Sequence, residues 1–217
     1  MSTPGYASSI PVARDRSRAV FAEVMGLVAI CCLFAAGGAY VGRDLTGVWF
    51  LLPWLLAIGC VIGLNVANAR GLRQVALALL FAVGLLLGIS VGTTLNYYAV
   101  NDPGALYQAA GATGLFVGAL GAGGYATRRD LSGLYRLAFW LLLGLIGFGI
   151  VLIFVNLPGG SLVYSVLGLG VFGLYVVIDF NRLRRSGEDQ VIPIAAGIFL
   201  DVFNIFLFFL RIFGNGR

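Results

Sequence analysis

Two aspartates lie in segments that are otherwise apolar enough to enter a lipid bilayer. Asp179 and Asp201 fall within the last two of seven such segments, on either side of a short basic loop. An aspartate at the centre of a membrane helix costs roughly 2.5–3.5 kcal/mol on insertion scales, and such residues usually face the bundle interior and serve a function. This pair is therefore the first candidate for chemistry in the chain.

The spacing of the two aspartates allows them to meet across antiparallel helices. If the sixth segment runs to about Arg185 and the seventh begins near Ile192, their depths differ by roughly 4–5 Å. Close carboxylates do not ionise independently, so the pair is expected to share a proton and titrate as a unit. This predicts a pH-sensitive gate. The same carboxyl groups are candidates for a transient metal contact with calcium, which prefers oxygen ligands.

Each aspartate also has a local explanation. Asp179 has Arg182 three residues later, so an ion pair at the helix end would account for it. Asp201 lies near the middle of its segment, where a hydrogen bond to a neighbouring helix is the alternative. A thin polar stripe places Asn204 and Arg211 on the face of Asp201, and we expect these two residues to support it.

Four other polar residues are candidates for the same site. Ser90 and Thr93 polarise the third segment and are candidates for lining a pathway. Arg70, at the inner end of the second segment, could reach an aspartate as a latch, or could simply be one more loop arginine. Glu23 lies about one turn inside the first segment, where snorkelling to the interface is the simpler explanation.

Composition identifies an all-α integral membrane protein. The 217 residues are 60% hydrophobic and 11% charged, with a mean hydropathy of +0.98, whereas soluble domains are about 25% charged. We predict a disordered tail over residues 1–18 and one seven-helix transmembrane domain over residues 19–214. The predicted spans, each near the roughly 20 residues that a bilayer needs, are Val20–Val41, Val48–Val66, Val75–Thr94, Leu106–Ala126, Leu137–Asn156, Leu162–Phe180 and Ile192–Phe213.

The composition also excludes several functions. Histidine and lysine are absent, which removes Ser-His, Cys-His and Schiff-base chemistry, and no cofactor is expected. Intramembrane aspartyl proteases use paired aspartates, but neither aspartate here follows a glycine, so an enzyme is disfavoured. The arginines are scattered over separate loops, which argues against a nucleic-acid partner.

Arginine placement predicts the orientation, because inner loops carry the excess of basic residues. With the N-terminus cytoplasmic and the C-terminus outside, three arginines are external: Arg43, Arg211 and Arg217. The other eleven of the fourteen are internal: Arg14, Arg16, Arg18, Arg70, Arg73, Arg128, Arg129, Arg136, Arg182, Arg184 and Arg185. A re-entrant last segment is the alternative. The compact loops, the lack of an Asn-X-Ser/Thr site and the absence of lysine favour a prokaryotic plasma membrane.

The chain resembles the Bax inhibitor (TMBIM) family, in its bacterial YccA-like branch, over about residues 15–214. The stretches that carry the resemblance are GISVG at 88–92, GYATRRDL at 124–131, YVVID at 175–179, DQVIP at 189–193 and LDVFNIFLFFLR at 200–211. The resemblance implies a seven-helix bundle with the last helix central. It also implies a pH-sensitive passive calcium leak channel governed by an aspartyl dyad, which Asp179 and Asp201 match.

The family's basic latch is best matched by Arg70. The segment around it is less basic than the family pattern, so Arg73 is the second candidate, and the loop between the aspartates is short. The alternative function is a membrane-embedded regulator of a membrane protease or stress response. Such a regulator would use glycine-rich helix faces such as that of Gly114 and Gly118, although packing within the bundle is the simpler use of this GxxxG. The expected partners are the lipid bilayer and calcium ions.

Overall fold

The computed structural model describes residues 9–45 and 47–214, with side chains from Ser17 onward except that of Phe50. Within these residues the chain forms seven long helices and two short 3-10 turns. They are α1 (Ser9–Gly42), η1 (Gly47–Phe50), α2 (Leu51–Ala69), α3 (Arg73–Asn101), α4 (Pro103–Ala126), α5 (Leu134–Phe154), α6 (Gly160–Leu183), η2 (Glu188–Gln190) and α7 (Val191–Gly214).

All seven helices of the described part are long and apolar enough to cross a membrane, which confirms the seven predicted spans. Most helices extend beyond the predicted ends, but α2 begins three residues after its predicted start and α5 ends two residues before its predicted end. α1 begins at Ser9, so residues 9–18, predicted to be disordered, are helical. Pro11 does not prevent this, because proline is tolerated in the first helical turn. Residues 1–8 lie outside the described residues.

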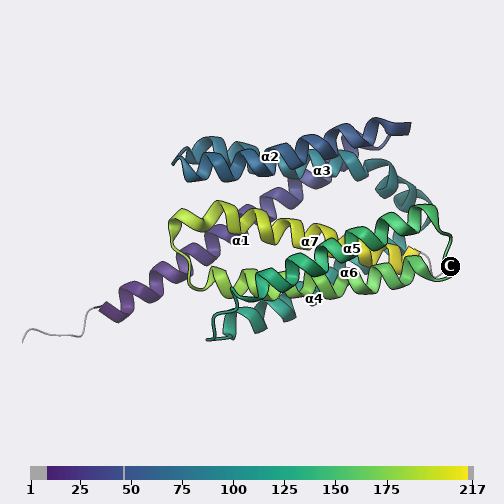
Figure 1. Cartoon of the computed structure of the whole chain (residues 1–217). Helices are drawn as coiled ribbons and strands as arrows, with labels where there is room; N and C mark the ends of the chain where they lie inside the picture. Colours follow the sequence, from purple (N-terminus) through teal and green to yellow (C-terminus); the bar gives the residue numbers. More distant parts are fainter. Residues whose placement is uncertain (1–8, 46, 215–217) are drawn as a thin grey trace, which may run out of the picture.

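The last helix is the most enclosed part of the bundle, as the resemblance implied. α7 contacts α1, α2, α3, α4 and α6, and Figure 1 shows it between the α2–α3 pair and the α4–α5–α6 group. Ile194, Ile198 and Ile205 are each at most 1% exposed. The 24 residues of α7 form one unbroken helix about 36 Å long, enough to cross a hydrocarbon core of about 30 Å. This favours a full crossing over a re-entrant segment.

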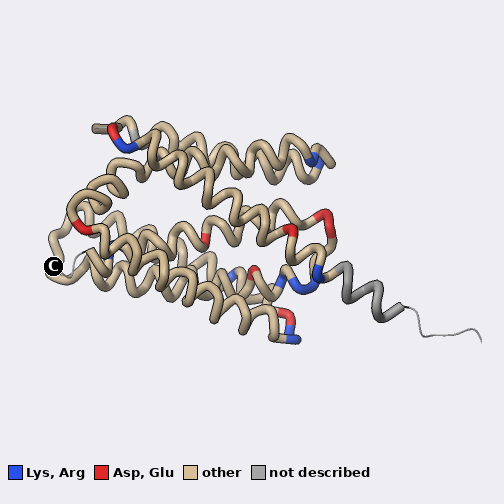
Figure 2. The backbone as a smooth tube through the Cα atoms, turned by 180° about the vertical axis from the view of Figure 1, so that it is seen from behind, with Lys and Arg blue, Asp and Glu red and all other residues tan. Residues whose placement is uncertain are grey.

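α1 and α3 are held together by backbone contact. A side chain at Gly88 of α3 would overlap the carbonyl of Ala35, and one at Gly38 of α1 would overlap the carbonyl of Leu85. Small residues at such positions let two membrane helices approach closely. The charged residues, by contrast, lie mainly toward the ends of the helices (Figure 2). The few acidic positions within the bundle therefore stand out.

Candidate functional site

Asp179 lies in the last turns of α6 and is 6% exposed. Two neighbouring helices enclose its carboxyl group. The hydroxyl of Tyr135, in the first turn of α5, donates a hydrogen bond to Oδ1. On the other side the backbone of Gly197 in α7 faces Oδ2, and a side chain at that position would overlap this oxygen. The carboxyl group therefore occupies a space formed by a tyrosine and a glycine.

Asp201 lies one helical turn after Gly197 in α7 and is 5% exposed. Its Oδ2 is buried and has no hydrogen-bond partner among the described residues. A buried polar atom left without a partner costs about 1–3 kcal/mol. The expected structural alternative, a hydrogen bond from this carboxyl group to a neighbouring helix, is not present at Oδ2. An unsatisfied group of this kind calls for an explanation by function or by a bound species.

The two aspartates act on each other electrostatically. Asp179 is near enough to exert a Coulombic effect on Asp201, and Tyr175, one turn before Asp179, is near enough to interact with both. The rings of Tyr175 and Tyr135 lie 6.4 Å apart. The structure thus brings together two buried carboxyl groups and two phenols from α5, α6 and α7, which is an arrangement that could hold or pass a proton.

Arg182 carries a charge that lies within range of both Asp179 and Tyr135. Its guanidinium donates a hydrogen bond to Oε1 of Gln190 at 2.6 Å. The local explanation for Asp179 is thus met only in part, because no ion pair joins it to Arg182 within the described residues.

The two latch candidates lie elsewhere in this structure. Arg70 is exposed in the turn after α2, and within the described chain it forms no ion pair with either aspartate. Arg73, at the start of α3, is paired with Glu23 of α1. Glu23 thus links the N-terminal half of α1 to the start of α3 through an exposed ion pair. The role of a latch stays a prediction for both arginines.

The supporting residues occupy three separate surroundings. Asn204 donates to the carbonyl of Leu200 in its own helix at 2.7 Å, and Ser90 donates to Leu87 at 2.7 Å; both line an otherwise apolar cavity of about 480 Å³. Thr93 donates to carbonyl oxygens at the end of α1. Arg211 lies over the ring of Tyr164 at 5.4 Å. The contacts of these four residues are made to groups other than the carboxyl group of Asp201.

A second polar network, which the sequence analysis missed, is centred on Asn181. This residue is 1% exposed and its amide donates to the carbonyls of Gly124, Thr127 and Arg129 at 2.8–3.2 Å. Its oxygen accepts from the backbone of Leu131 at 3.1 Å. One side chain of α6 thus satisfies the end of α4 and the following loop. An asparagine two residues after a buried aspartate was the available signal.

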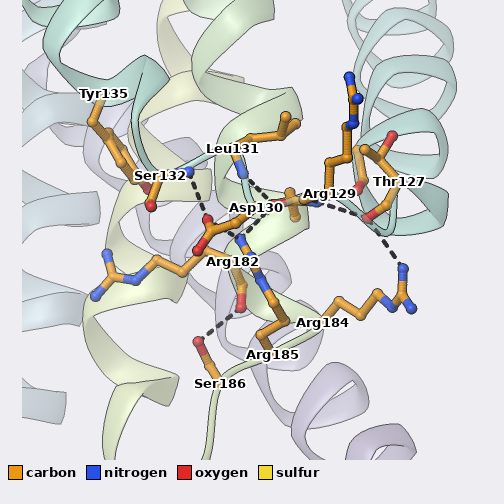
Figure 3. Close-up of polar contacts among 12 residues, drawn as sticks. Thr127, Arg129, Asp130, Leu131, Ser132, Tyr135, Arg182, Arg184, Arg185 and Ser186 are labelled. Carbon is orange, nitrogen blue, oxygen red and sulfur yellow. Dashed lines mark hydrogen bonds and ion pairs between the residues drawn. The ribbon is translucent and has the colours of Figure 1, made fainter.

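Arginines of the basic loop complete this network (Figure 3). Arg184 donates to the carbonyls of Tyr125, Ala126 and Thr127 at 3.1–3.5 Å, and Arg185 forms an ion pair with Asp130 at 2.8 Å. The pKa of Asp130 is lowered from its ordinary value, chiefly by hydrogen bonds from the backbone and side chain of Ser132 and then by Arg185. The α4–α5 loop is fastened to the end of α6.

A cavity of about 330 Å³ opens beside the aspartates at this end of the bundle. Its walls include Asp130, Tyr135, Arg182 and Arg185. Tyr135 thus lines the cavity and also donates to Asp179, so its phenol stands between the loop region and the first buried carboxyl group. The described residues contain no group of three or more residues of the His, Cys, Asp and Glu types that could hold a metal. Two carboxyl groups supply fewer oxygens than the six to eight that calcium takes.

The chain as a whole is similar to known proteins. The family model described as "Inhibitor of apoptosis-promoting Bax1" matches residues 17–217. The chain is 28% identical to the inner membrane protein YbhL of Escherichia coli K12 over 88% of this chain and 86% of that protein. It is 29% identical to a protein of Deinococcus radiodurans described as uncharacterized, over 94% and 93% of the two chains. An uncharacterized membrane protein of Vibrio cholerae is 27% identical, over 79% of this chain and 89% of that one.

Proposed function

This chain belongs to the Bax inhibitor family of membrane proteins, and from that premise we propose that it is a pH-sensitive passive leak channel for calcium, gated by the carboxyl groups of Asp179 and Asp201. The observation that carries the proposal is the buried, unpartnered Oδ2 of Asp201 beside a second buried carboxyl group. A protein that keeps such a group in a membrane helix, at the cost it imposes, is expected to use it.

In the proposed mechanism, protonation of the pair shifts an equilibrium between a closed and an open bundle. Taking a proton from a shared pair adds negative charge between α6 and α7, and α7 contacts most of the other helices. A difference of one pH unit in proton affinity between the two states corresponds to about 1.4 kcal/mol, or roughly tenfold in their ratio. Tyr135 would separate the gate from the loop-side cavity.

The proposed function is transport, which needs neither a resident cofactor nor an enzyme activity. It includes an orientation in which the arginine-rich loops and the N-terminus are cytoplasmic and the C-terminus is outside, in a prokaryotic plasma membrane. The arginine asymmetry supports this orientation, and the similarity to the inner membrane protein YbhL supports the choice of membrane. A reporter domain fused to the C-terminus tests the orientation, since it would be active only on the predicted side.

The function is tested by calcium flux into dye-loaded proteoliposomes between pH 5 and 8. Wild type is compared with Asp179→Asn and Asp201→Asn, and Asp44→Asn is the matched control, because Asp44 is exposed and pairs with Arg43 outside the spans. We expect the pH midpoint of flux to move or vanish in both dyad variants and to stay unchanged in the control. Flux with the same pH dependence in all four proteins would remove the dyad from the mechanism. No protein-dependent flux at any pH would favour the regulatory interaction protein.

A further inference from the structure

A long groove runs along α4 on the side facing α1. Its volume is about 1250 Å³, and glycines of α4 line it. A side chain added at Gly114 or Gly118 would meet nothing within 4 Å. One turn further, Gly121 lies against the ring of Phe180, and Gly124 lies against the backbone of α6. The GxxxG therefore does not pack inside the bundle as expected, and only the following glycines do.

One end of this groove is basic. Three arginines line it: Arg18 of α1, Arg128 after α4 and Arg184 directly after α6. Arg18 and Arg128 are exposed. Within its described lining there is no acidic side chain. Arg184 is directed to carbonyl oxygens at the end of α4, as Figure 3 shows for Thr127. Three cationic side chains from three elements thus converge where the groove reaches the end of the spans.

The length of the groove matches one leaflet of a bilayer. From Gly114 to Ala126 the lining residues of α4 cover about 18 Å at roughly 1.5 Å per residue. Half of a hydrocarbon core of about 30 Å is about 15 Å. An acyl chain that begins at the basic end would therefore lie along the glycines and end near the midplane. A soluble anion would use only the arginines and leave the apolar remainder empty.

We propose that this groove binds one anionic phospholipid, with its phosphate at the arginines and an acyl chain along Gly118 and Gly114. Basic pockets between membrane helices are suited to such head groups. A second copy of the chain is a poorer occupant. Two copies inserted in the same direction are related by an axis along the membrane normal, so each Arg128 would face the other copy's basic end at the same depth without a counter-charge.

The test uses the full chain in mild detergent and measures lipid affinity by native mass spectrometry and by the lipid-induced rise in Tm. The probes are phosphatidylglycerol, phosphatidylcholine with the same acyl chains, and glycerol phosphate. Arg18→Gln with Arg128→Gln removes two charges, and Gly118→Leu fills the groove. Arg136→Gln and Gly147→Leu are the matched controls, because Arg136 does not line the groove and Gly147 of α5 also faces open space.

We expect phosphatidylglycerol to bind at least tenfold more tightly than phosphatidylcholine, and glycerol phosphate not to compete. Each arginine removed should weaken binding about fivefold, Gly118→Leu should weaken it tenfold or more, and neither control should change it. Equal binding of both lipids, competition by glycerol phosphate, an equal loss in Arg136→Gln, or a dimer that Gly118→Leu dissociates would each overturn the proposal. If one variant does not fold, as judged by Tm without lipid, the other decides.

Discussion

Gly197 of α7 lies against the carboxyl group of Asp179 in α6, at a position where any side chain would overlap Oδ2. This contact fixes how closely the two helices approach next to the candidate dyad. Asp179 is buried and held on its other oxygen by Tyr135, so it has little freedom to move aside. Gly197 is thus a positioning residue for Asp179. Substituting the glycine tests this positioning without removing the carboxyl group.

The first prediction concerns this contact. Gly197→Ala should lower stability by about 1–3 kcal/mol, because the added methyl group forces Asp179 or α7 to shift, and it should also displace the pH midpoint of flux. Gly170→Ala in α6 is the matched control, since its methyl group would meet nothing and alanine is the better helix former by up to about 1 kcal/mol. Thermal unfolding in detergent measures both. Equal Tm changes in the two variants would contradict the tight contact.

The second prediction concerns the unpartnered carboxyl group. Asp201→Ala should raise stability by about 1–2 kcal/mol, because it removes a buried polar atom without a hydrogen bond. Asp102→Ala provides the contrast. Asp102 accepts a hydrogen bond from the backbone of Ala105 at the start of α4, so its loss should lower stability by about 1 kcal/mol. A clear drop in Tm for Asp201→Ala would mean that Asp201 has a partner in the folded protein.

The third prediction concerns the phenol beside Asp179. Tyr135→Phe keeps the ring but removes the hydrogen bond to Oδ1. A hydrogen bond contributes about 0.5–1.5 kcal/mol net, so stability should fall by that order, and the pH midpoint of flux should move by up to about one unit. Tyr107→Phe is the control, because Tyr107 is 79% exposed. An unchanged midpoint in Tyr135→Phe would detach this tyrosine from the gate.

The fourth prediction concerns the network around Asn181. Asn181→Ala should lower stability by at least about 2 kcal/mol, since it removes the hydrogen bonds that join this buried side chain of α6 to the carbonyls of Gly124, Thr127 and Arg129 and to the backbone N–H of Leu131. Asn65→Ala is the matched change, because Asn65 is exposed and bonds only within its own helix, and an effect within about 0.5 kcal/mol is expected there. Similar losses from both would mean that the amide of Asn181 is not structural.

The fifth prediction concerns pH and the α4–α5 loop. The pKa of Asp130 is lowered by the donors of Ser132 and then by Arg185. A carboxyl group with a lowered pKa contributes stability above its ordinary value, near pH 4, and loses that contribution as pH falls through the folded value. The protection of the loop amides, measured as exchange relative to the intrinsic rate at each pH, should therefore fall on acidification below about pH 4. In Asp130→Asn this protection should be low already at neutral pH and show no further change; a step retained in that variant would assign the effect to another group.

The membrane-spanning helices could be predicted because the hydropathy of a segment depends only on residues that are neighbours in the sequence. Runs of about twenty apolar residues between short loops locate a span, and the structure confirms all seven. The burial of Asp201 was equally accessible, because a carboxyl group near the middle of a membrane segment usually faces the bundle interior. The tail differs from its prediction. Residues 9–18 were predicted to be disordered because they are polar, but α1 begins at Ser9.

The contacts of the site could not be predicted in the same way, because they depend on how the helices are rotated about their axes. Gly197 and Tyr135 are ordinary residues in the sequence, and they acquire a role only because α5 and α7 turn them toward Asp179. Glu23 and Arg73 likewise pair across two helices far apart in sequence. The partners of Asn181 come from a loop whose path no residue pattern defines.

The backbone contact between α1 and α3 has a mechanical consequence. Because Gly88 and Gly38 allow the two helices to touch without intervening side chains, sliding or separating them would require many close contacts to break together. We therefore expect α1 and α3 to travel as one rigid body whenever the bundle changes shape. Any hinge must then lie at other helix interfaces, where side chains that can change conformation separate the backbones. The Glu23–Arg73 ion pair joins the two helices of this rigid body, so we expect it to stay intact when the bundle changes shape.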